Sequence, residues 1–200
     1  MKRLIDMLGA GVALVVLLPL IAAVALAIKL TSPNPFKGSP VIFRQRRLGL
    51  NGAPFDVYKF RSMAVNAPEI RNPDGSAFAG EDDPRVTPIG NFIRKTSLDE
   101  LPQLFNVLIG DMSLVGPRPD QVDQIRFYDD QERRKLLVKP GITGLAQISG
   151  RNDISWKMRK ALDVRYVEER SLMLDLEILL KTIPYVLLRK GIHSGVSPQV

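Results

Sequence analysis

The sequence predicts an α+β fold, mostly helical, with a membrane segment at its N-terminus. An uncharged apolar stretch covers residues 7–28, two short segments rich in aromatic and β-branched residues follow it, and most of the remainder is predicted to be helical. The chain has 200 residues, enough for one compact domain in addition to a membrane element. We therefore divide it into a membrane segment, residues 1–30, and a second domain, residues 31–200.

The apolar segment allows three interpretations. A helix of about 20 apolar residues can cross a bilayer, so a spanning helix fits. Lys2 and Arg3 before the segment, and the small residues at 23–25, also fit a cleaved signal peptide. The third interpretation is a helix that enters the membrane and returns to the same face. Pro19 lies near the middle, where proline kinks a helix, and basic residues flank both ends, so we favour this re-entrant helix-break-helix.

Charge and residue types restrict the chemistry. The net charge of +7 indicates anionic partners, which include nucleic acid, an acidic bilayer surface and phosphorylated small molecules. We expect no nucleic acid, because that partner would call for basic stretches with interleaved aromatic residues or for a recognition helix, whereas the sequence offers only Trp156 and scattered tyrosines. The absence of cysteine excludes disulfides, zinc-thiolate sites and thiol nucleophiles, and the single histidine, His193, is close to the C-terminus. Reactive groups should therefore be Asp, Glu, Lys, Arg, Ser or Tyr.

The second domain begins with a small β element. Residues 41–43 and 55–60 have the composition of strands and are separated by glycine, asparagine and proline, which predicts a hairpin. Residues 64–85 contain several prolines and glycines without periodicity, so we expect a long loop that is either a functional lid or disordered.

Helices are expected in the rest of the chain. Thr87 and Pro88 provide a cap and a first-turn proline for a helix that reaches about residue 95. Further helices are predicted at about 97–108, 119–137, 156–170 and 172–190, the last ending at Gly191. This last helix is strongly apolar but interrupted by charges, so it either packs in the core or lies in the membrane interface.

Residues 94–103 are the segment best suited to catalysis, because the carboxylates Asp99 and Glu100 follow closely after Arg94. One interpretation is structural, since Ser97 and Glu100 have the spacing of a capping box. The other is functional. A helix N-terminus binds phosphate and lowers a carboxylate pKa, so Asp99 would remain an ionised nucleophile. Glu100 would share Mg²⁺ with it, and Arg94 would hold phosphate oxygens.

Three other segments present cations, although each alone fits a plain strand or loop. Residues 58–63 place Lys59 and Arg61 on one face of a strand, and residues 110–119 present Arg118 in a rigid Gly-Pro-Arg-Pro turn. Residues 139–152 end in Arg151 and contain glycines that allow a close approach of the backbone to a ligand. Together these cations beside glycine-rich turns suit a diphosphate.

Four of these motifs occur in the order found in one known family. They are Lys-Phe-Arg-Ser-Met at 59–63, Ser-Leu-Asp-Glu-Leu-Pro-Gln at 97–103, Gly-Pro-Arg-Pro at 116–119 and Pro-Gly-Ile-Thr-Gly-Leu-Ala-Gln at 140–147. In these motifs the chain resembles the bacterial sugar transferases, the monotopic phosphoglycosyl transferases, over nearly its whole length. Four ordered motifs favour the functional interpretation of Asp99 and Glu100 over the capping box.

The resemblance implies a phosphoglycosyl transferase that starts a bacterial capsule, O-antigen, exopolysaccharide or other glycoconjugate. Asp99 would attack the sugar-linked phosphate of a UDP-sugar, release UMP and form a covalent intermediate, which a polyprenyl phosphate such as undecaprenyl phosphate would then take over. Glu100 would join Asp99 around Mg²⁺. The remaining expected phosphate or nucleotide contacts are Arg94, Arg118, Lys59, Arg61 and Arg151.

The resemblance also implies how the chain is arranged in the cell. Residues 1–30 would form the re-entrant helix hinged at Pro19, which follows Leu18 where the family often has serine. Residues 31–200 would form the catalytic domain, with membrane-interface helices, on the cytoplasmic face of the bacterial inner membrane. A homodimer is compatible with the resemblance, and the chain is expected to be the minimal catalytic unit. The alternatives are a non-catalytic membrane scaffold and a metal-dependent nucleotide-sugar hydrolase of the same fold.

Overall fold

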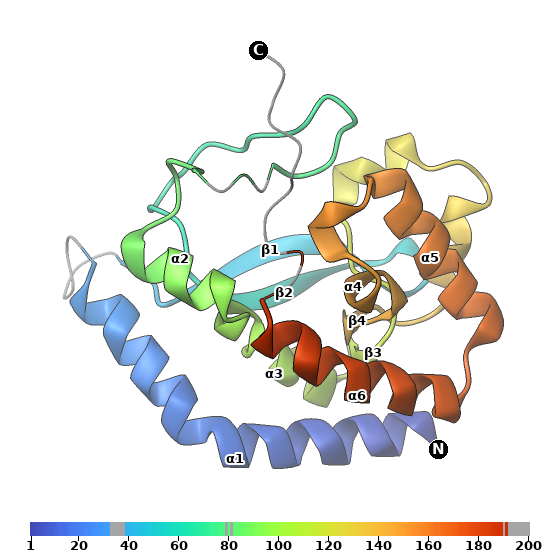
Figure 1. Cartoon of the computed structure of the whole chain (residues 1–200), viewed down its shortest axis with the longest axis horizontal. Coiled ribbons are helices and arrows are strands. Elements are labelled where there is room, and N and C mark those ends of the chain that lie inside the picture. The colour runs from blue at the N-terminus through green and yellow to red at the C-terminus, as the bar shows by residue number, and fades with distance from the viewer. Residues whose placement is uncertain (33–38, 79, 81, 190, 192–200) are drawn as a thin grey trace.

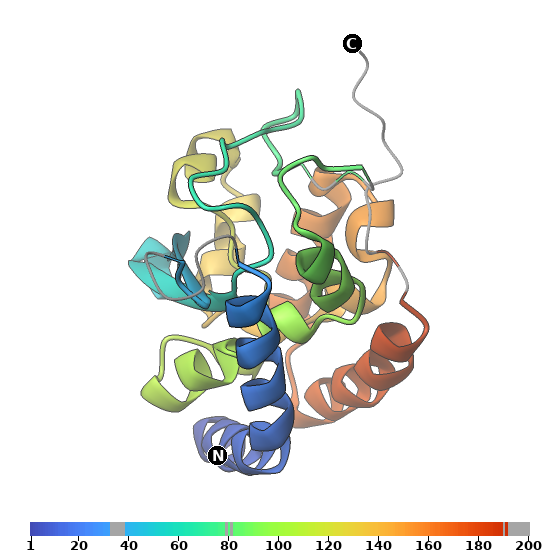
Figure 2. The ribbon, with the colours of Figure 1, turned by 90° about the vertical axis from the view of Figure 1, so that its left-hand side faces the viewer.

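The protein is represented by a computed structural model that describes residues 1–32, 39–78, 80, 82–189 and 191; His193 lies outside these residues. Figures 1 and 2 show helix α1 (Lys2–Leu30) along one edge of the domain, with α3 (Gln103–Ile109) and α6 (Leu172–Leu187) on the same side. Helix α5 (Trp156–Glu169) lies on the side away from α1. The mostly helical α+β prediction is confirmed.

Helix α1 is one continuous helix that contains Pro19, and Figure 1 shows that it bends along its length. The bend agrees with a proline that lacks an N–H donor in the middle of a helix. The structure does not show a break that would divide α1 into two helices. Re-entry into the membrane therefore stays a prediction.

Both ends of α1 are attached to the same domain. Near the N-terminus, Asp6 accepts hydrogen bonds from Ser113 Oγ at 2.8 Å and from the backbone N–H of Leu114 at 3.1 Å. Lys2 pairs with Asp175 of α6 at 2.6 Å, and the Arg3 guanidinium donates to the last carbonyls of α3.

At the opposite end of α1, Val24 and Ile28 are buried against Phe60 and Ile93. One domain thus holds the first and the last turns of the helix.

Two small sheets support the loops. Strands β1 (Ile42–Leu48) and β2 (Pro54–Phe60) form the predicted antiparallel hairpin, joined by the short 3₁₀ helix η1 (Leu50–Gly52). Strands β3 (Ser113–Val115) and β4 (Gly141–Thr143) form a parallel pair that was not predicted. Three residues per strand are too few to show the alternation by which a strand is recognised.

The predicted helices are confirmed in part. Helix α2 (Pro88–Lys95) has Thr87 as its cap, whose hydroxyl accepts the N–H of Gly90 at 3.0 Å. Helix α5 lies where it was expected, and α6 begins where it was expected but ends at Leu187, before the predicted stop at Gly191. The expected helix at 97–108 is divided into the 3₁₀ helix η2 (Leu98–Glu100) and α3, with Pro102 between them. The expected helix at 119–137 is wrong, because that stretch forms two 3₁₀ helices, η3 (Val122–Phe127) and η4 (Glu132–Leu137).

The last stretch before α5 contains a short helix α4 (Leu145–Ile148) and the 3₁₀ helix η5 (Arg151–Asp153). Helix α6 contributes Ile178 to a core cluster with Val115 and Tyr166, so the core-packing interpretation holds for one face. Its other face is exposed. The described part of residues 64–85 contains turns and a single β-bridge between Arg71 and Ala77, and a bridge between Met63 and Val86 joins the two ends of the stretch.

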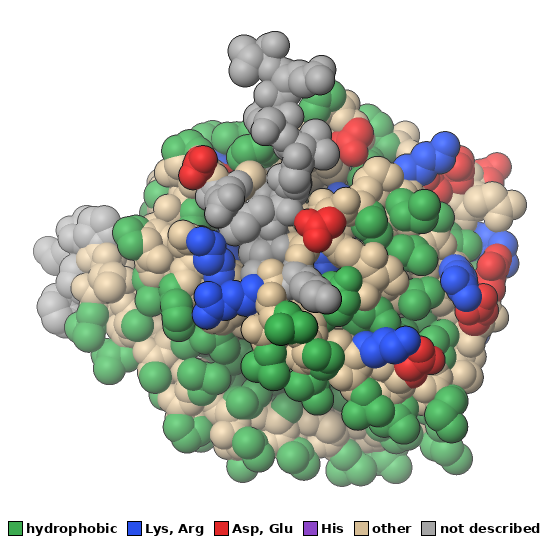
Figure 3. Space-filling view, in the orientation of Figure 1, with side chains coloured by type: hydrophobic (Ala, Val, Ile, Leu, Met, Phe, Trp, Pro, Cys, Tyr) green, Lys and Arg blue, Asp and Glu red, His purple; other side chains and the backbone are tan. Residues whose placement is uncertain are grey.

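An apolar surface covers the side of the domain formed by α1, α3 and α6. Only 11% of the most apolar window of α1 is buried against the rest of the protein, and α1 is long and apolar enough to cross a membrane. Figure 3 shows hydrophobic side chains gathered along this lower side, whereas Lys, Arg, Asp and Glu lie higher up. Its largest exposed members are Leu4, Leu8, Val12, Val15, Val16, Leu18, Phe105, Ile109, Met173, Leu176, Leu180, Ile183 and Leu187.

Candidate active site

Asp99 and Glu100 lie in η2, at the sharp turn between α2 and α3. The turn is made by Ser97, whose backbone is left-handed with φ of 57°. Leu98 and Leu101 pack against the apolar cluster of Val24, Ile28, Phe60 and Ile93, and this contact holds the turn in place. The predicted capping box is not formed, because Ser97 makes no side-chain cap and Glu100 points elsewhere.

Glu100 is a buried carboxylate held by two cations. Lys59 of β2 donates to Glu100 Oε1 at 2.8 Å, and Arg118, in the loop after β3, donates to the same oxygen at 2.7 Å. Glu100 itself is 9% exposed. Burial alone would raise the pKa of Glu100, but the charges of Arg118 and Lys59 outweigh it and keep the pKa well below its ordinary value. Glu100 is therefore a fixed anion that holds Lys59 and Arg118 in place.

Asp99 is electrostatically different from its neighbour. Within the part of the chain that the structure describes, its carboxylate accepts no hydrogen bond and forms no ion pair. Burial, and then the negative charge of Glu100, raise the pKa of Asp99 to about 6. The expectation that a helix N-terminus lowers this pKa is wrong, because η2 is a three-residue 3₁₀ turn beside a second carboxylate. Above pH 6 Asp99 is an ionised and uncommitted carboxylate.

Of the other predicted cations, two lie near the carboxylates and one lies at the end of α1. Arg94 is close enough to lower the pKa of Asp99 through its charge. The Arg151 guanidinium donates to Ser97 Oγ at 3.2 Å. Arg61 lies elsewhere, since its guanidinium donates to Ser32 after the end of α1 and reaches neither carboxylate within the described chain. The structure thus brings Lys59, Arg94, Arg118 and Arg151 to the carboxylates, but not Arg61.

The glycine-rich loops position Arg118 by packing against each other. A Cβ on Gly141 would lie 2.0 Å from the backbone N of Gly116, and one on Gly144 would lie 2.2 Å from Gly116 O. Both glycines therefore allow close contact between two backbone segments, whereas the sequence suggested close contact with a ligand.

Two side chains fix the loop that carries Arg118 from the other side. The backbone N–H of Arg118 faces Asp163 Oδ1 at 3.4 Å, and Asp163 pairs with the buried Lys135 at 2.6 Å.

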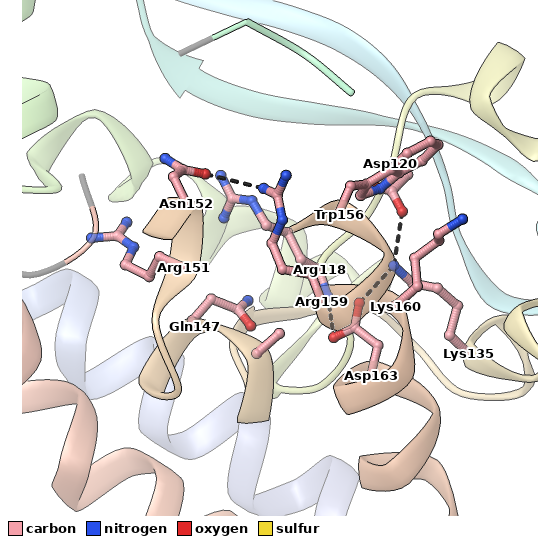
Figure 4. Close-up of a pocket in the computed structure, with 11 residues that line it drawn as sticks. Arg118, Asp120, Lys135, Gln147, Arg151, Asn152, Trp156, Arg159, Lys160 and Asp163 are labelled. Atoms are coloured by element: carbon pink, nitrogen blue, oxygen red, sulfur yellow. Dashed lines mark hydrogen bonds and ion pairs between the residues drawn. The ribbon is translucent and has the colours of Figure 1, made fainter. Parts of the chain in front are cut away.

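A pocket extends from Arg118 between α4, η5 and α5 (Figure 4). Residues beyond the predicted set line it, notably Gln147, Asn152 and Arg159. Sequence reasoning missed Arg159 because it belongs to a helix with many exposed charges, where one arginine carries no distinguishing signal. Gln147 lies in a quoted motif, yet nothing in the motif identifies its amide as a lining group.

The carboxylates fit a magnesium ion that takes further ligands from phosphate and water. Mg²⁺ typically uses one or two carboxylates together with substrate phosphates. Within the described residues neither Asp99 oxygen is engaged in a hydrogen bond, and Glu100 Oε2 accepts only a long hydrogen bond of 3.5 Å from Arg118. Among the residues that the structure describes, no cluster of three or more Asp, Glu, His or Cys side chains offers a site made by protein alone.

Comparisons with known proteins agree with this geometry. The family model described as "Bacterial sugar transferase" matches residues 1–189. The chain is 48% identical to the galactosyl transferase CpsE of Streptococcus agalactiae, over 95% of this chain and 43% of CpsE. It is 47% identical to EpsL of Bacillus subtilis, an uncharacterized sugar transferase, over 97% of this chain and 91% of EpsL.

A third relative is the UDP-glucose:undecaprenyl-phosphate glucose-1-phosphate transferase of Escherichia coli, 44% identical over 92% of this chain and 39% of the relative. The chain thus spans less than half the length of CpsE and of the E. coli relative. The family match over residues 1–189, together with EpsL, shows that this chain belongs to the bacterial sugar transferase family.

Proposed function

We propose that this protein transfers a sugar 1-phosphate from a UDP-sugar to a polyprenyl phosphate, with undecaprenyl phosphate as the principal candidate, and releases UMP. The observation that carries the proposal is the different state of two adjacent carboxylates. Glu100 is held by Lys59 and Arg118, whereas Asp99 beside it forms no ion pair within the described residues. The names of the S. agalactiae and E. coli relatives support this reaction class.

The first step is attack by an Asp99 oxygen on the sugar-linked phosphorus. The bond between that phosphorus and the oxygen that bridges to the second phosphate breaks, and UMP departs with both bonding electrons. The product is an acyl phosphate that joins Asp99 to the phosphosugar. Arg94 and Arg118 would hold the phosphate oxygens as charge moves to UMP, and their proximity to Asp99 and Glu100 supports this role.

The second step regenerates the carboxylate. A phosphate oxygen of the polyprenyl phosphate attacks the phosphorus of the intermediate, the bond from phosphorus to Asp99 breaks, and a polyprenyl diphosphate sugar leaves. The two substrates use one site in turn, so a lipid and a soluble nucleotide need not occupy it together. Magnesium held by Asp99 and Glu100 would neutralise charge on the phosphate groups.

The attachment of α1 supports insertion into the membrane from one face. Twenty-nine helical residues span about 43 Å, which exceeds a hydrocarbon core of about 30 Å. A straight spanning helix would place its ends on opposite sides of the bilayer, yet Asp6 and Ile28 both contact the one domain. We propose that the exposed apolar side of α1, α3 and α6 enters the cytoplasmic leaflet of the inner membrane and that the domain lies in the cytoplasm.

Single-cysteine labelling tests this topology without background, because the natural chain has no cysteine. Cysteines introduced at Met1 and at Thr31 should both react only from the cytoplasmic side. Labelling of one of them from the periplasm would show a spanning helix instead.

UMP release tests the reaction. The protein in detergent or nanodiscs is incubated with UDP-glucose and UDP-galactose, with and without undecaprenyl phosphate, and UMP is quantified. We expect sustained release with the acceptor and a burst of at most one UMP per enzyme without it. Sustained release of UMP without acceptor would indicate a hydrolase, and no release with any UDP-sugar would favour a scaffold.

A further inference from the structure

The pocket beside Arg118 contains two cations that form no ion pair with a carboxylate in the described chain. Three of its five cations have acidic partners: Arg118 pairs with Glu100, Lys135 with Asp120 and Asp163, and Lys160 with Glu132. The other two, Arg151 and Arg159, have neutral partners. Arg151 donates to Ser97 Oγ at 3.2 Å, and Arg159 donates to Asn152 Oδ1 at 3.1 Å.

Burial makes this unmatched charge costly. Desolvation lowers the pKa of Arg151 and of Arg159, and the charges of Glu100 near Arg151 and of Asp120 near Arg159 do not offset it. The Nε of Arg159 is buried and has no acceptor in the described part of the chain. Arg151 also has left-handed backbone, with φ of 51°, an unusual conformation for a residue other than glycine. Two guanidinium groups in one pocket, neither of them paired with a carboxylate of the described chain, are suited to bind an anionic ligand.

The pocket also contains an uncommitted amide. Gln147 is 8% exposed, and neither its side-chain nitrogen nor its oxygen has a hydrogen-bond partner in the described structure. Buried amides are normally satisfied, so an unsatisfied one that lines a pocket suggests a missing ligand. An amide offers one donor and one acceptor together, which suits a nucleobase edge or ribose hydroxyls.

The position of the pocket distinguishes between two sources of phosphate. It is formed by α4, η5 and α5, and α5 lies on the side away from α1 and the apolar surface (Figures 1 and 2). A lipid phosphate would approach from the apolar side, whereas a soluble nucleotide approaches from the aqueous side. Arg118 belongs to the pocket and also pairs with Glu100, so a ligand here lies near Glu100 and the adjacent Asp99.

We propose that this pocket binds the nucleoside monophosphate half of the donor, with Arg151 and Arg159 holding its phosphate and Gln147 facing its nucleoside. This inference rests on the proposed function, because it assigns the part of the UDP-sugar that leaves as UMP. It adds Arg159 and Gln147 to the residues that contact the donor.

Binding of UMP to the full-length protein tests the inference without turnover. Trp156 is the only tryptophan and lines the pocket, so its fluorescence and calorimetric titration both report binding. Arg159→Gln should weaken UMP binding about ten- to hundredfold, the loss expected for a hydrogen bond to a charged group. The matched control is Arg165→Gln, which removes an exposed arginine of α5 that pairs with Glu169 and should leave UMP binding unchanged.

Two additional probes distinguish the phosphate from the nucleoside and from the lipid. Uridine, which has no phosphate, should bind weakly and equally to the wild type and Arg159→Gln, but less well to Gln147→Leu. Binding of a short-chain polyprenyl phosphate should be insensitive to Arg159→Gln. If Arg159→Gln does not fold, Arg151→Gln is used with the same expectations, and retention of the wild-type melting temperature is the folding criterion.

Unchanged UMP affinity in a folded Arg159→Gln protein would overturn the inference, as would a loss confined to the lipid phosphate. Either result is distinguishable from failure of the proposed function. If the proposed function fails, the protein releases no UMP from any UDP-sugar. If only the pocket assignment fails, UMP release continues and the affinity of Arg159→Gln for UMP is unaltered.

Discussion

Because the pKa of Asp99 is raised, the rate of the first half-reaction should fall as the pH is lowered through about 6. Only the ionised carboxylate is a nucleophile, and its pKa of about 6 replaces an ordinary value of 3.8 because of burial and the neighbouring Glu100. The ionised fraction is then about 97% at pH 7.5 and about 9% at pH 5. The initial rate of UMP release should fall about tenfold between these two pH values. With an ordinary aspartate, about 94% would still be ionised at pH 5 and the rate would barely change.

The assay is a rapid-quench measurement of single-turnover UMP release without acceptor, with UDP-sugar and Mg²⁺ well below saturation. Under these conditions the pH profile reports Asp99 in the free enzyme, before a bound cation lowers its pKa. The two phosphates of a UDP-sugar remain ionised throughout this range, so the substrate does not titrate. Glu100→Gln supplies the matched variant: loss of the negative charge should lower the pKa of Asp99 and move the midpoint of the profile below pH 6. A single-turnover rate that is equal at pH 5 and pH 7.5 in the wild type would refute the reasoning.

Three further predictions concern stability and the cations. Asp99→Asn should stabilise the fold by about 1–3 kcal/mol at pH 7.5, because the raised pKa makes the ionised form costly in the folded state; the gain should vanish near pH 4, as thermal melting at both pH values would show. Arg118→Ala should slow UMP release about ten- to hundredfold and Arg118→Lys less, because lysine keeps the charge near Glu100 but loses the second donor. Gly141→Ala should destabilise the protein by several kcal/mol, measured by urea unfolding, because its Cβ would lie 2.0 Å from Gly116 N.

Each of these has a result that would contradict it. Equal stability of Asp99→Asn and wild type at pH 7.5 would mean that the ionised Asp99 carboxylate does not destabilise the folded state. Full activity in Arg118→Ala would remove this cation from the mechanism. Gly11→Ala is the control for Gly141→Ala, since a Cβ at Gly11 has its nearest neighbour at 4.0 Å; an equal loss in both would show that the loop contact is not special.

The sequence predicted the elements that depend on local signals. Thr87 and Pro88 mark the start of α2, and the hairpin follows from two β-branched segments around a turn. It could not predict the parallel pair of β3 and β4, because three-residue strands are defined only by the partner backbone that they meet. The stretch 119–137 has helical composition, but it forms two 3₁₀ helices, in which Lys135 pairs with the distant Asp163 and with Asp120 at the start of the stretch.

The candidate site was predicted by residue type and only partly by position. Adjacent Asp99 and Glu100 were recognisable, yet the division into a free and a paired carboxylate depends on Lys59 and Arg118 from distant segments. Arg61 was expected beside Lys59, but it follows the end of β2 and turns toward Ser32. No sequence pattern shows such a turn, because it depends on where α1 ends.

The measurement that tests the central claim most directly is intact-protein mass spectrometry after incubation with a UDP-sugar and no acceptor. The wild-type protein should gain the mass of one phosphosugar, and peptide mapping should locate it on Asp99. Addition of undecaprenyl phosphate should remove the adduct, and Asp99→Asn should form none. An adduct on another residue, or UMP release with undecaprenyl phosphate in the Asp99→Asn protein, would contradict catalysis through Asp99.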